Sequence, residues 1–477
     1  MTTSDRTSYA VGFAGLDDEV AVEALPITGV FPQWLSGTLL RTGPAKYDIG
    51  ATSVNHWFDG LAMLHRFGFD KGRVSYRNRF LRSETFCESL DKGALARGGF
   101  ATDPCRTLFQ RVAAVLRPAF TDNGNVSIDV FGGETVALTE TTLPVCFDPE
   151  TLATLGDRAL SQEVGGQISI AHPHHDAARG CRYSYVVDFG RKSHYRLFSI
   201  ANADGSEHVV AEMPVDHPAY MHSFAMTERY LVLTEFPLVV DPLRLLLAAE
   251  PFIRNYRWTP ERGLRFHVFE KDGGGHVTSA TADPVFAFHH VNAFEDGDNI
   301  VVDFVAYPDP QIIDQLYLPH LRVGAPVDAT GLLTRYVVPL EGSGEVTATR
   351  INDTMIELPR IDYDLVAGRR YRYVWGTGRR TTDGFLDSIV KIDVDTGQSQ
   401  TWWQEHCFPG EPVFVPAPGR KREGEGVLLS VVLDALAARS FLLVLDAQTL
   451  KEVARAECPH LIPFGLHGSY LPQAGVA

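Results

Sequence analysis

The sequence has no long apolar run, no closely spaced cysteines and no excess of positive charge. No uninterrupted apolar segment reaches the roughly 18 residues that a membrane-spanning helix needs, and residues 1–6 lack the apolar core of a signal peptide. The six cysteines have no Cys-x-x-Cys spacing, which is typical of reduced thiols in the cytoplasm. With 59 acidic and 43 basic residues, a net charge of -16, the chain lacks the basic face that nucleic-acid phosphates attract. We therefore expect a cytoplasmic protein without a nucleic-acid partner.

The composition, 45% hydrophobic and 21% charged, is that of a large globular core. No low-complexity linker divides the chain, so we expect one domain over residues 1–477. Residues 1–20 are polar and predict a loose N-terminal arm.

Short apolar runs separated by Gly, Asp and Asn recur along most of the chain and predict strands joined by turns. A weak repeat, Asp-x-x-Thr, begins at Asp148, Asp393 and Asp446. The last two copies are 53 residues apart, and the first two are 245 apart, which is five times 49. A unit of about 50 residues is typical of propeller blades with four strands each. The pattern predicts an all-β fold, a β-propeller of about seven blades, with helical and loop insertions capping one face.

Two insertions differ from this strand pattern. Residues 106–120 carry leucines and valines at helical spacing, and residues 237–253 are more apolar still. They are interpreted either as helices packed on the propeller or as a patch that touches a bilayer, with arginines at the headgroups. Both interpretations stay open, so peripheral association of the protein with a membrane also stays open.

Four histidines lie in apolar segments where no neighbouring acid satisfies them: His172, His222, His289 and His467. One such residue is more often a hydrogen-bonded core histidine than a ligand, but four in the same setting favour a shared metal ion. Imidazole suits Fe, Zn, Cu or Ni, so ligand type leaves the metal open. Metal-bound imidazoles usually donate their other N–H to a carboxylate or carbonyl. The acids in comparable apolar contexts are Glu140 and Glu357, with Glu423 and Glu425 as a weaker pair after a loop.

Four further segments stand out: Asn-His-Trp-Phe-Asp-Gly at 55–60, Asp-Pro-Cys-Arg within 102–106, Glu-Pro-Val-Phe-Val-Pro at 411–416 and Glu-Gly-Val-Leu-Leu-Ser at 425–430. With the histidine segments, they resemble the carotenoid cleavage oxygenase family, in particular the branch of animal carotene oxygenases and the retinal pigment epithelium retinoid isomerase. The resemblance spans residues 25–468. It implies a seven-bladed β-propeller with a non-haem Fe(II), the cofactor Fe(2+), held on the axis by four histidines beside a hydrophobic tunnel.

The resemblance also implies individual roles. The family keeps the first histidine of its Phe-His-His-x-Asn segment, which selects His289 over His290. His172 matches the Ala-His-Pro ligand, His222 the Met-His-Ser ligand and His467 the C-terminal ligand. The glutamates that the family places behind its ligands fall on Glu140, Glu357 and Glu423, with Glu425 as the alternative to Glu423.

The activity implied is cleavage of a conjugated double bond of a carotenoid or apocarotenoid by O2, to give aldehydes resembling retinal. Stilbene-cleaving members carry a lysine before the first glutamate, and Thr139 stands there, which argues against a stilbene substrate. The alternatives are a retinoid isomerase that uses the same iron as a Lewis acid, a stilbene-cleaving dioxygenase despite Thr139, and a non-catalytic propeller scaffold. The residues expected to line the tunnel are Phe58, Phe86, Phe100, Thr139, Phe236, Phe286 and Phe464.

Overall fold

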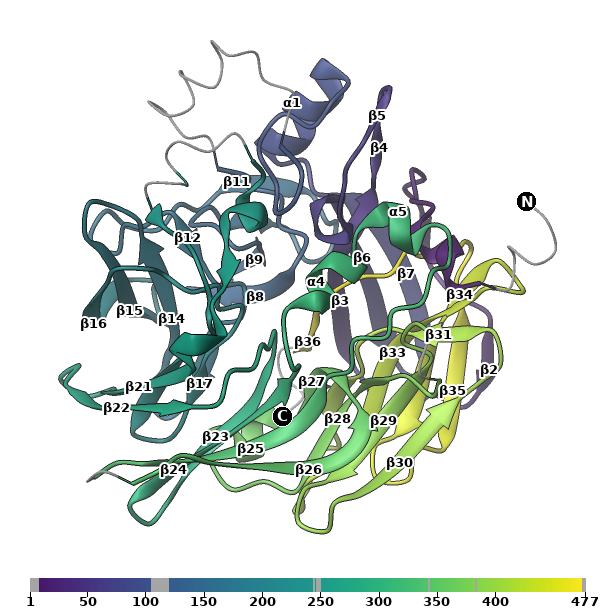
Figure 1. Cartoon of the computed structure of the whole chain (residues 1–477). Coiled ribbons are helices and arrows are strands. Elements are labelled where there is room, and N and C mark those ends of the chain that lie inside the picture. Colours follow the sequence, from purple (N-terminus) through teal and green to yellow (C-terminus); the bar gives the residue numbers. More distant parts are fainter. Residues whose placement is uncertain are drawn as a thin grey trace.

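The computed structural model describes residues 8–103, 120–242, 245, 250–341, 344–381 and 384–473. Its strands form seven antiparallel sheets arranged around one centre, a seven-bladed β-propeller (Figure 1). This confirms the predicted fold class.

The blades are numbered I to VII around the ring, and the strands of each blade follow in spatial order from one sheet edge to the other. Blade I contains β1 (Ala21–Val22), β7 (Arg73–Phe80), β6 (Leu61–Asp70), β3 (Gly37–Lys46) and β36 (Gly468–Pro472). Blade II contains β11 (Thr154–Asp157), β10 (Val145–Phe147), β9 (Glu134–Leu138) and β8 (Ser127–Phe131). Blade III contains β12 (Ile168–Ser169) and β13 (His174–Asp176), both paired with β14 (Cys181–Asp188), then β15 (Ser193–Ala201) and β16 (Glu207–Val215).

Blade IV contains β17 (Ala225–Met226), β18 (Tyr230–Glu235), β21 (Leu264–Glu270) and β22 (His276–Ala282). Blade V contains β23 (His290–Asp296), β24 (Asn299–Ala306), β25 (Leu332–Pro339) and β26 (Thr347–Met355). Blade VI contains β27 (Glu357–Arg360), β28 (Tyr373–Gly378), β29 (Ser388–Asp393) and β30 (Gln398–Trp403). Blade VII contains β2 (Ile27–Gly29), β35 (Glu452–Glu457), β34 (Arg439–Asp446), and β33 (Gly426–Asp434), which pairs with both β31 (Cys407–Pro409) and β32 (Val413–Pro416). Two small hairpin sheets, β4 (Asp48–Ile49) with β5 (Thr52–Ser53) and β19 (Leu238–Val239) with β20 (Arg257–Trp258), lie outside the blades.

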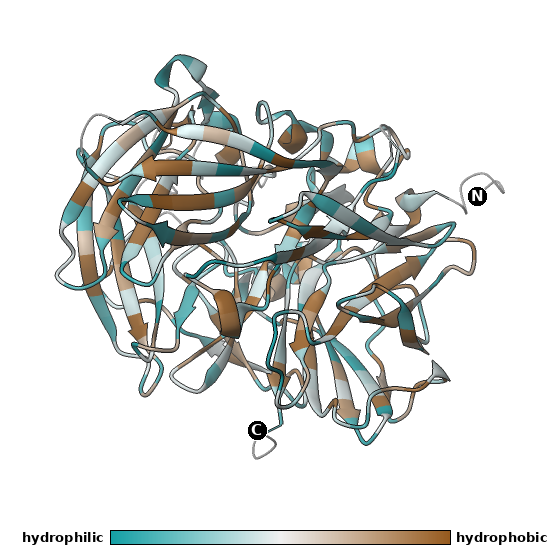
Figure 2. Cartoon of the chain, turned by 90° about the horizontal axis from the view of Figure 1, so that it is seen from below, coloured by the Kyte–Doolittle hydropathy of each residue, from teal (hydrophilic) through white to brown (hydrophobic). Residues whose placement is uncertain are grey.

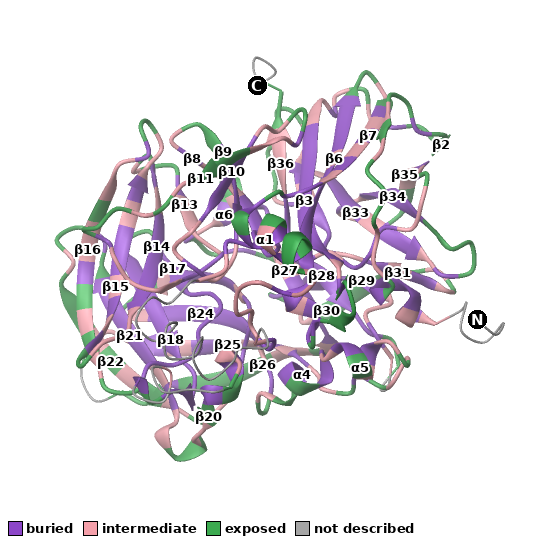
Figure 3. Ribbon diagram, turned by 90° about the horizontal axis from the view of Figure 1, so that it is seen from above, coloured by how far each residue is buried: buried purple, intermediate pink, exposed green. Residues whose placement is uncertain are grey.

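The hydrophobic pattern of each strand follows its place in a blade. Along β7 the side chains alternate, with Val74, Tyr76 and Phe80 buried and arginines between them more exposed. The middle strand β24 is buried on both faces because neighbouring blades cover it on either side. Figure 2 shows the alternation as changes of colour along the strands, and Figure 3 shows buried segments in the interior of the ring.

Two strand pairings close the ring. The C-terminal strand β36 pairs with β3 in blade I, so that Ser469 lies opposite Leu40. The N-terminal strand β2 pairs with β35 in blade VII, where Thr28 lies opposite Arg455. Early and late parts of the chain are therefore joined at two places.

The Asp-x-x-Thr repeat marks the turn between the last two strands of blades II, VI and VII. In blade VII the Asp446 carboxylate accepts bonds from the backbone N–H and the hydroxyl of Thr449, and Asp148 binds Thr151 in the same way. The spacing between Asp148 and Asp393 covers four blades, not the five expected, because insertions lengthen the blades between them.

The helices α1 (Glu84–Lys92), α4 (Gln311–Gln315) and α5 (Leu318–Leu321) lie on one side of the ring (Figure 1). The other short helical segments are α6 (Tyr363–Val366) and the 3-10 turns η2 (Tyr9–Phe13), η3 (Trp57–Asp59), η4 (Phe252–Asn255) and η5 (Pro260–Arg262). The sequence pattern did not predict α1, although Ser83 caps its first turn and Gly93, in the left-handed region, ends it.

The structure alters three expectations about the insertions and the N-terminal arm. Residues 104–119 lie outside the described residues, so the helix expected at 106–120 lies there too, apart from Phe120. A helix over all of 237–253 is wrong at both ends, which form β19 and η4. The loose arm is wrong for residues 8–20, because Tyr9 and Phe13 are buried against the ring of Phe385. Among the described residues, no helix is long and apolar enough to cross a membrane.

Candidate metal centre

The four predicted histidines come together at the axis of the propeller. Each lies beside the start of an edge strand: His172 between β12 and β13, His222 before β17, His289 before β23 and His467 before β36. They therefore come from blades III, IV, V and I. A propeller brings the corresponding ends of these strands to one point, which explains how residues nearly 300 positions apart can meet.

The ring nitrogens have the spacing of ligands around a single ion. The Nε2 atoms of His172 and His222 are 2.9 Å apart, and those of His289 and His467 are 3.2 Å apart. One ligand nitrogen from each of the four residues lies within 4.8 Å of all the others. Bonds of about 2.0–2.1 Å to one ion would place nitrogens up to about 4.2 Å apart, close to this span.

A carboxylate lies behind three of the four rings. The Nδ1 of His222 is 2.5 Å from Glu140 Oε1, and the Nδ1 of His289 is 2.6 Å from Glu357 Oε2. The third carboxylate belongs to Glu411, whose Oε1 is 2.7 Å from Nδ1 of His467. Blades II, VI and VII supply these acids, so each of the seven blades contributes one group.

The placement expected for Glu423 is wrong. Its carboxylate accepts bonds from the backbone N–H groups of Arg372 and Tyr373 and contacts none of the four rings. Glu425 instead binds Arg422 and the N–H of Lys421.

The tautomers show that the cluster suits a cation. Because an ionised carboxylate only accepts, the Nδ1 atoms of His289 and His467 carry the protons that bind Glu357 and Glu411. Their Nε2 atoms then present lone pairs to each other at 3.2 Å with no proton between them. Burial lowers the pKa of His172 well below its usual range, and burial also lowers that of His467, to about 4. Neutral imidazoles with converging lone pairs form the donor set that a metal ion requires.

The neighbouring His290 cannot serve as a ligand in this arrangement. One ring nitrogen lies 2.8 Å from the Ser223 hydroxyl and the other 2.8 Å from the Thr234 hydroxyl. Burial lowers its pKa to about 3, so the ring is neutral and fully hydrogen-bonded.

Two of the acids behind the rings, Glu357 and Glu411, are ionised. Burial alone would raise the pKa of Glu357, but the His289 ring and other hydrogen-bond donors outweigh it and lower the pKa. Burial likewise opposes ionisation of Glu411, and the Arg360 guanidinium, with His467 and Arg41, lowers its pKa far below the usual range. Ionised carboxylates fix the rings in the tautomer described above.

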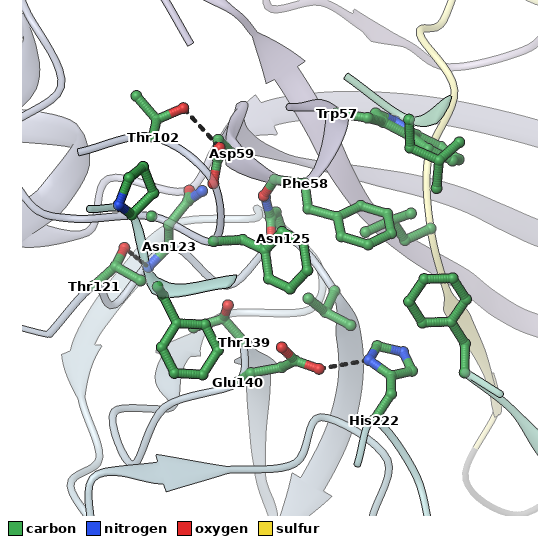
Figure 4. Close-up of a pocket in the computed structure, with 18 of the residues that line it drawn as sticks. Trp57, Phe58, Asp59, Thr102, Thr121, Asn123, Asn125, Thr139, Glu140 and His222 are labelled. Carbon is green, nitrogen blue, oxygen red and sulfur yellow. Dashed lines mark hydrogen bonds and ion pairs between the residues drawn. The ribbon is translucent and has the colours of Figure 1, made fainter. Parts of the chain in front are cut away.

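A cavity of about 440 Å³ opens beside the cluster (Figure 4). Three of the four histidines line it, and its wall is mainly apolar. Of the residues expected to line a tunnel, Phe58, Phe100 and Thr139 do so. Phe86, Phe236, Phe286 and Phe464 do not line it: they are buried in the surrounding core, where Phe236 packs on Phe286 and Phe464 on Phe385.

Comparison with known proteins identifies the family. The family model described as retinal pigment epithelial membrane protein matches residues 13–472. The chain belongs to this family. These proteins are the carotenoid cleavage oxygenases that the sequence resembles.

Curated carotenoid oxygenases match most of the chain. A carotenoid isomerooxygenase of Galleria mellonella is 36% identical over 94% of this chain and 93% of that protein. A β,β-carotene 15,15'-dioxygenase of Gallus gallus is 34% identical over 94% of this chain and 95% of that protein. Among solved structures, a variant of the Synechocystis apocarotenoid oxygenase aligns with a TM-score of 0.87 at 26% identity, covering 99% of both chains. A cobalt-substituted form of that oxygenase aligns with a TM-score of 0.86, also at 26% identity and 99% coverage.

Proposed function

We propose that this protein is a non-haem Fe(II) dioxygenase that cleaves a conjugated double bond of a carotenoid or apocarotenoid. The observation that carries the proposal is the cluster of four converging imidazoles, His172, His222, His289 and His467, at an apolar cavity. Ferrous iron held by these imidazoles would supply a site at which O2 is bound and activated. Both oxygen atoms enter the two carbonyl products, so the reaction balances without an external reductant.

The residues of the chain orient the ligands and the substrate. Glu140, Glu357 and Glu411 hold the Nδ1 protons, which leaves Nε2 of each partner ring free to bind. The aromatic side chains of Phe58 and Phe100 line the cavity, so a polyene that enters it leaves water and lies against apolar surface. Holding one double bond close to the cluster is the main task that remains for the protein.

Two features support a polyene substrate. Thr139 lines the cavity directly before Glu140, where the stilbene-cleaving members carry lysine. The relatives at 36% and 34% identity bear the names of carotenoid oxygenases over nearly their whole length. Peripheral contact with a membrane, which would deliver such a substrate, is part of the same proposal.

The test is product analysis under labelled O2. Purified protein loaded with Fe(II) is incubated separately with β-carotene, an apocarotenal and a retinyl ester under ¹⁸O2. Labelled aldehyde from either of the first two substrates supports cleavage, and unlabelled isomerised alcohol from the ester supports the retinoid isomerase instead. Because one relative is named an isomerooxygenase, the cis and trans forms of each product are also separated. A protein that purifies without metal and forms no product would be a scaffold.

A further inference from the structure

The carboxylate behind His467 is held differently from the other two. Glu140 accepts a hydrogen bond from the Tyr220 hydroxyl, at 2.9 Å, and Glu357 accepts one from the Tyr307 hydroxyl, also at 2.9 Å. Glu411 has no tyrosine partner among the described residues and is held by charged groups instead. The asymmetry shows that the His467 side of the cluster depends on another element.

That element is Arg360, the last residue of β27 in blade VI. Its Nε donates to Glu411 Oε1 at 2.8 Å, and its Nη2 donates to the backbone carbonyl of Gly468 at 2.6 Å. One planar guanidinium thus connects the acid behind the ring to the residue that follows His467. Glu411 Oε2 also accepts the N–H of Gly468, at 2.9 Å, which completes a closed set of contacts.

A second arginine holds the other side of the same segment. Arg41 in β3 donates to the carbonyl of Leu466 at 3.1 Å and to that of Glu411 at 3.2 Å. Its guanidinium is 3.8 Å from Glu411 Oε2, farther than the direct bond made by Arg360. Arg41 therefore anchors the backbone, and Arg360 anchors the carboxylate.

The backbone around His467 has little space to move. A Cβ on Gly43 would come within 2.5 Å of the Cα of Gly465, so β3 and this segment lie in close contact. Within that close packing, the orientation of the His467 ring depends on its Nδ1 bond to Glu411, and the position of Glu411 depends on Arg360.

We propose that Arg360 is a positioning residue of the metal centre, which acts through Glu411 to aim Nε2 of His467 and through Gly468 to hold the strand that follows. The inference rests on the proposed function in that it takes the four histidines as a metal site. The proposed role depends on the shape of the Arg360 side chain as well as on its charge. A lysine at 360 would keep the charge but lacks the planar guanidinium that reaches both acceptors, the Glu411 carboxylate and the Gly468 carbonyl.

The test measures metal affinity independently of turnover. Each apo-protein is titrated with Co²⁺, because the visible absorption of this ion reports the number and geometry of its ligands. The proteins compared are the wild type, Arg360→Gln, Arg360→Lys, Glu411→Gln and the double variant Arg360→Gln/Glu411→Gln. The matched control is Arg335→Gln, which removes a similarly buried arginine from its two-point contact with Asp303 in blade V. Thermal unfolding of each apo-protein reports stability separately.

We expect Arg360→Gln to weaken Co²⁺ binding by about 10-fold to 100-fold, the usual effect of losing an outer partner of a ligand, and to change the Co²⁺ spectrum. Arg360→Lys should restore little of the affinity, and the double variant should bind no more weakly than Glu411→Gln alone, because both changes act through one contact. Arg335→Gln should lower stability while leaving affinity and spectrum unchanged.

Wild-type affinity in Arg360→Gln would overturn the inference and leave the proposed metal site intact. If Arg360→Gln and Arg335→Gln lose Co²⁺ affinity equally, the loss reflects stability, and the inference is overturned. If Arg360→Lys keeps the full affinity, the charge of residue 360 is sufficient, and the inference is overturned as well. If the wild type binds neither Co²⁺ nor Fe²⁺, the proposed function fails together with the inference.

Discussion

Two adjacent histidines, His289 and His290, should respond oppositely to replacement by alanine. His289 points Nε2 into the cluster, so His289→Ala should lower metal affinity by more than the roughly 100-fold typical of an outer partner and leave the purified protein nearly free of iron. Both ring nitrogens of His290 are instead hydrogen-bonded, to the hydroxyls of Ser223 and Thr234, so His290→Ala should keep the iron.

The cost of His290→Ala should appear in stability instead. The Thr234 hydroxyl is fully buried and loses its ring partner, which costs about 1–3 kcal/mol. Ser223 loses less because its hydroxyl still donates to the carbonyl of Phe288. With the space left by the ring, we expect a total loss of about 2–5 kcal/mol in the free energy of unfolding.

The assay pairs iron content per chain with denaturant unfolding of each variant. His290→Gln, whose amide retains a donor for one hydroxyl, provides a milder variant if His290→Ala does not fold. The reasoning is refuted if His289→Ala keeps its iron, or if a folded His290 variant loses it.

Three further predictions concern the same region. Glu140→Gln should lower kcat/KM for an apocarotenal by about 10-fold to 100-fold without abolishing turnover, because the acid orients His222 and is not a ligand; wild-type turnover would contradict this. Removal of metal by a chelator should lower the Tm, and Fe²⁺ at 100 times its Kd should restore about 2.7 kcal/mol; an unchanged Tm would argue against a resident ion. Burial raises the pKa of Asp59 from 3.8 to about 7, so its contribution to stability is full below pH 3.8 and is lost as the pH rises towards 7. Asp59→Asn should therefore remove a pH-dependent loss on the order of 3 kcal/mol between pH 5 and pH 8, measured as unfolding free energy at the two pH values, whereas the exposed control Asp216→Asn should keep it.

The histidines could be found from the sequence because each lies in an apolar segment that a strand must bury. Glu411 was missed although it stands in the segment Glu-Pro-Val-Phe-Val-Pro that carried part of the resemblance. In the structure it lies where β31 ends and β32 begins, both paired with β33, and this interruption turns its side chain towards the axis. An interruption in strand pairing depends on the partner strand and cannot be read from the local sequence. The acidic loop at Glu423 therefore stood out more clearly in the sequence as the source of the third carboxylate.

The residues of the cavity wall show a second feature that could not be predicted from the sequence. Phe58 and Phe286 both lie in apolar aromatic segments, yet only Phe58 faces the cavity, while Phe286 is fully buried between other rings. Aromatic composition indicates that a residue leaves water but not which of two apolar surroundings it enters. The predicted number of blades, seven, is correct, but the repeat spacing placed five blades between Asp148 and Asp393 where the structure has four, since insertions alter the spacing of a repeat without altering its sheets.

The order of the ligands along the chain sets the order in which the centre can be assembled during synthesis. His172, His222 and His289 emerge within 117 residues of one another, but His467 follows His289 only after another 178. Translation must pass residue 467 and β36 must dock on β3 before the fourth nitrogen arrives. A nascent chain therefore offers at most three of its imidazoles, and acquisition of a fully coordinated ion is confined to the finished propeller.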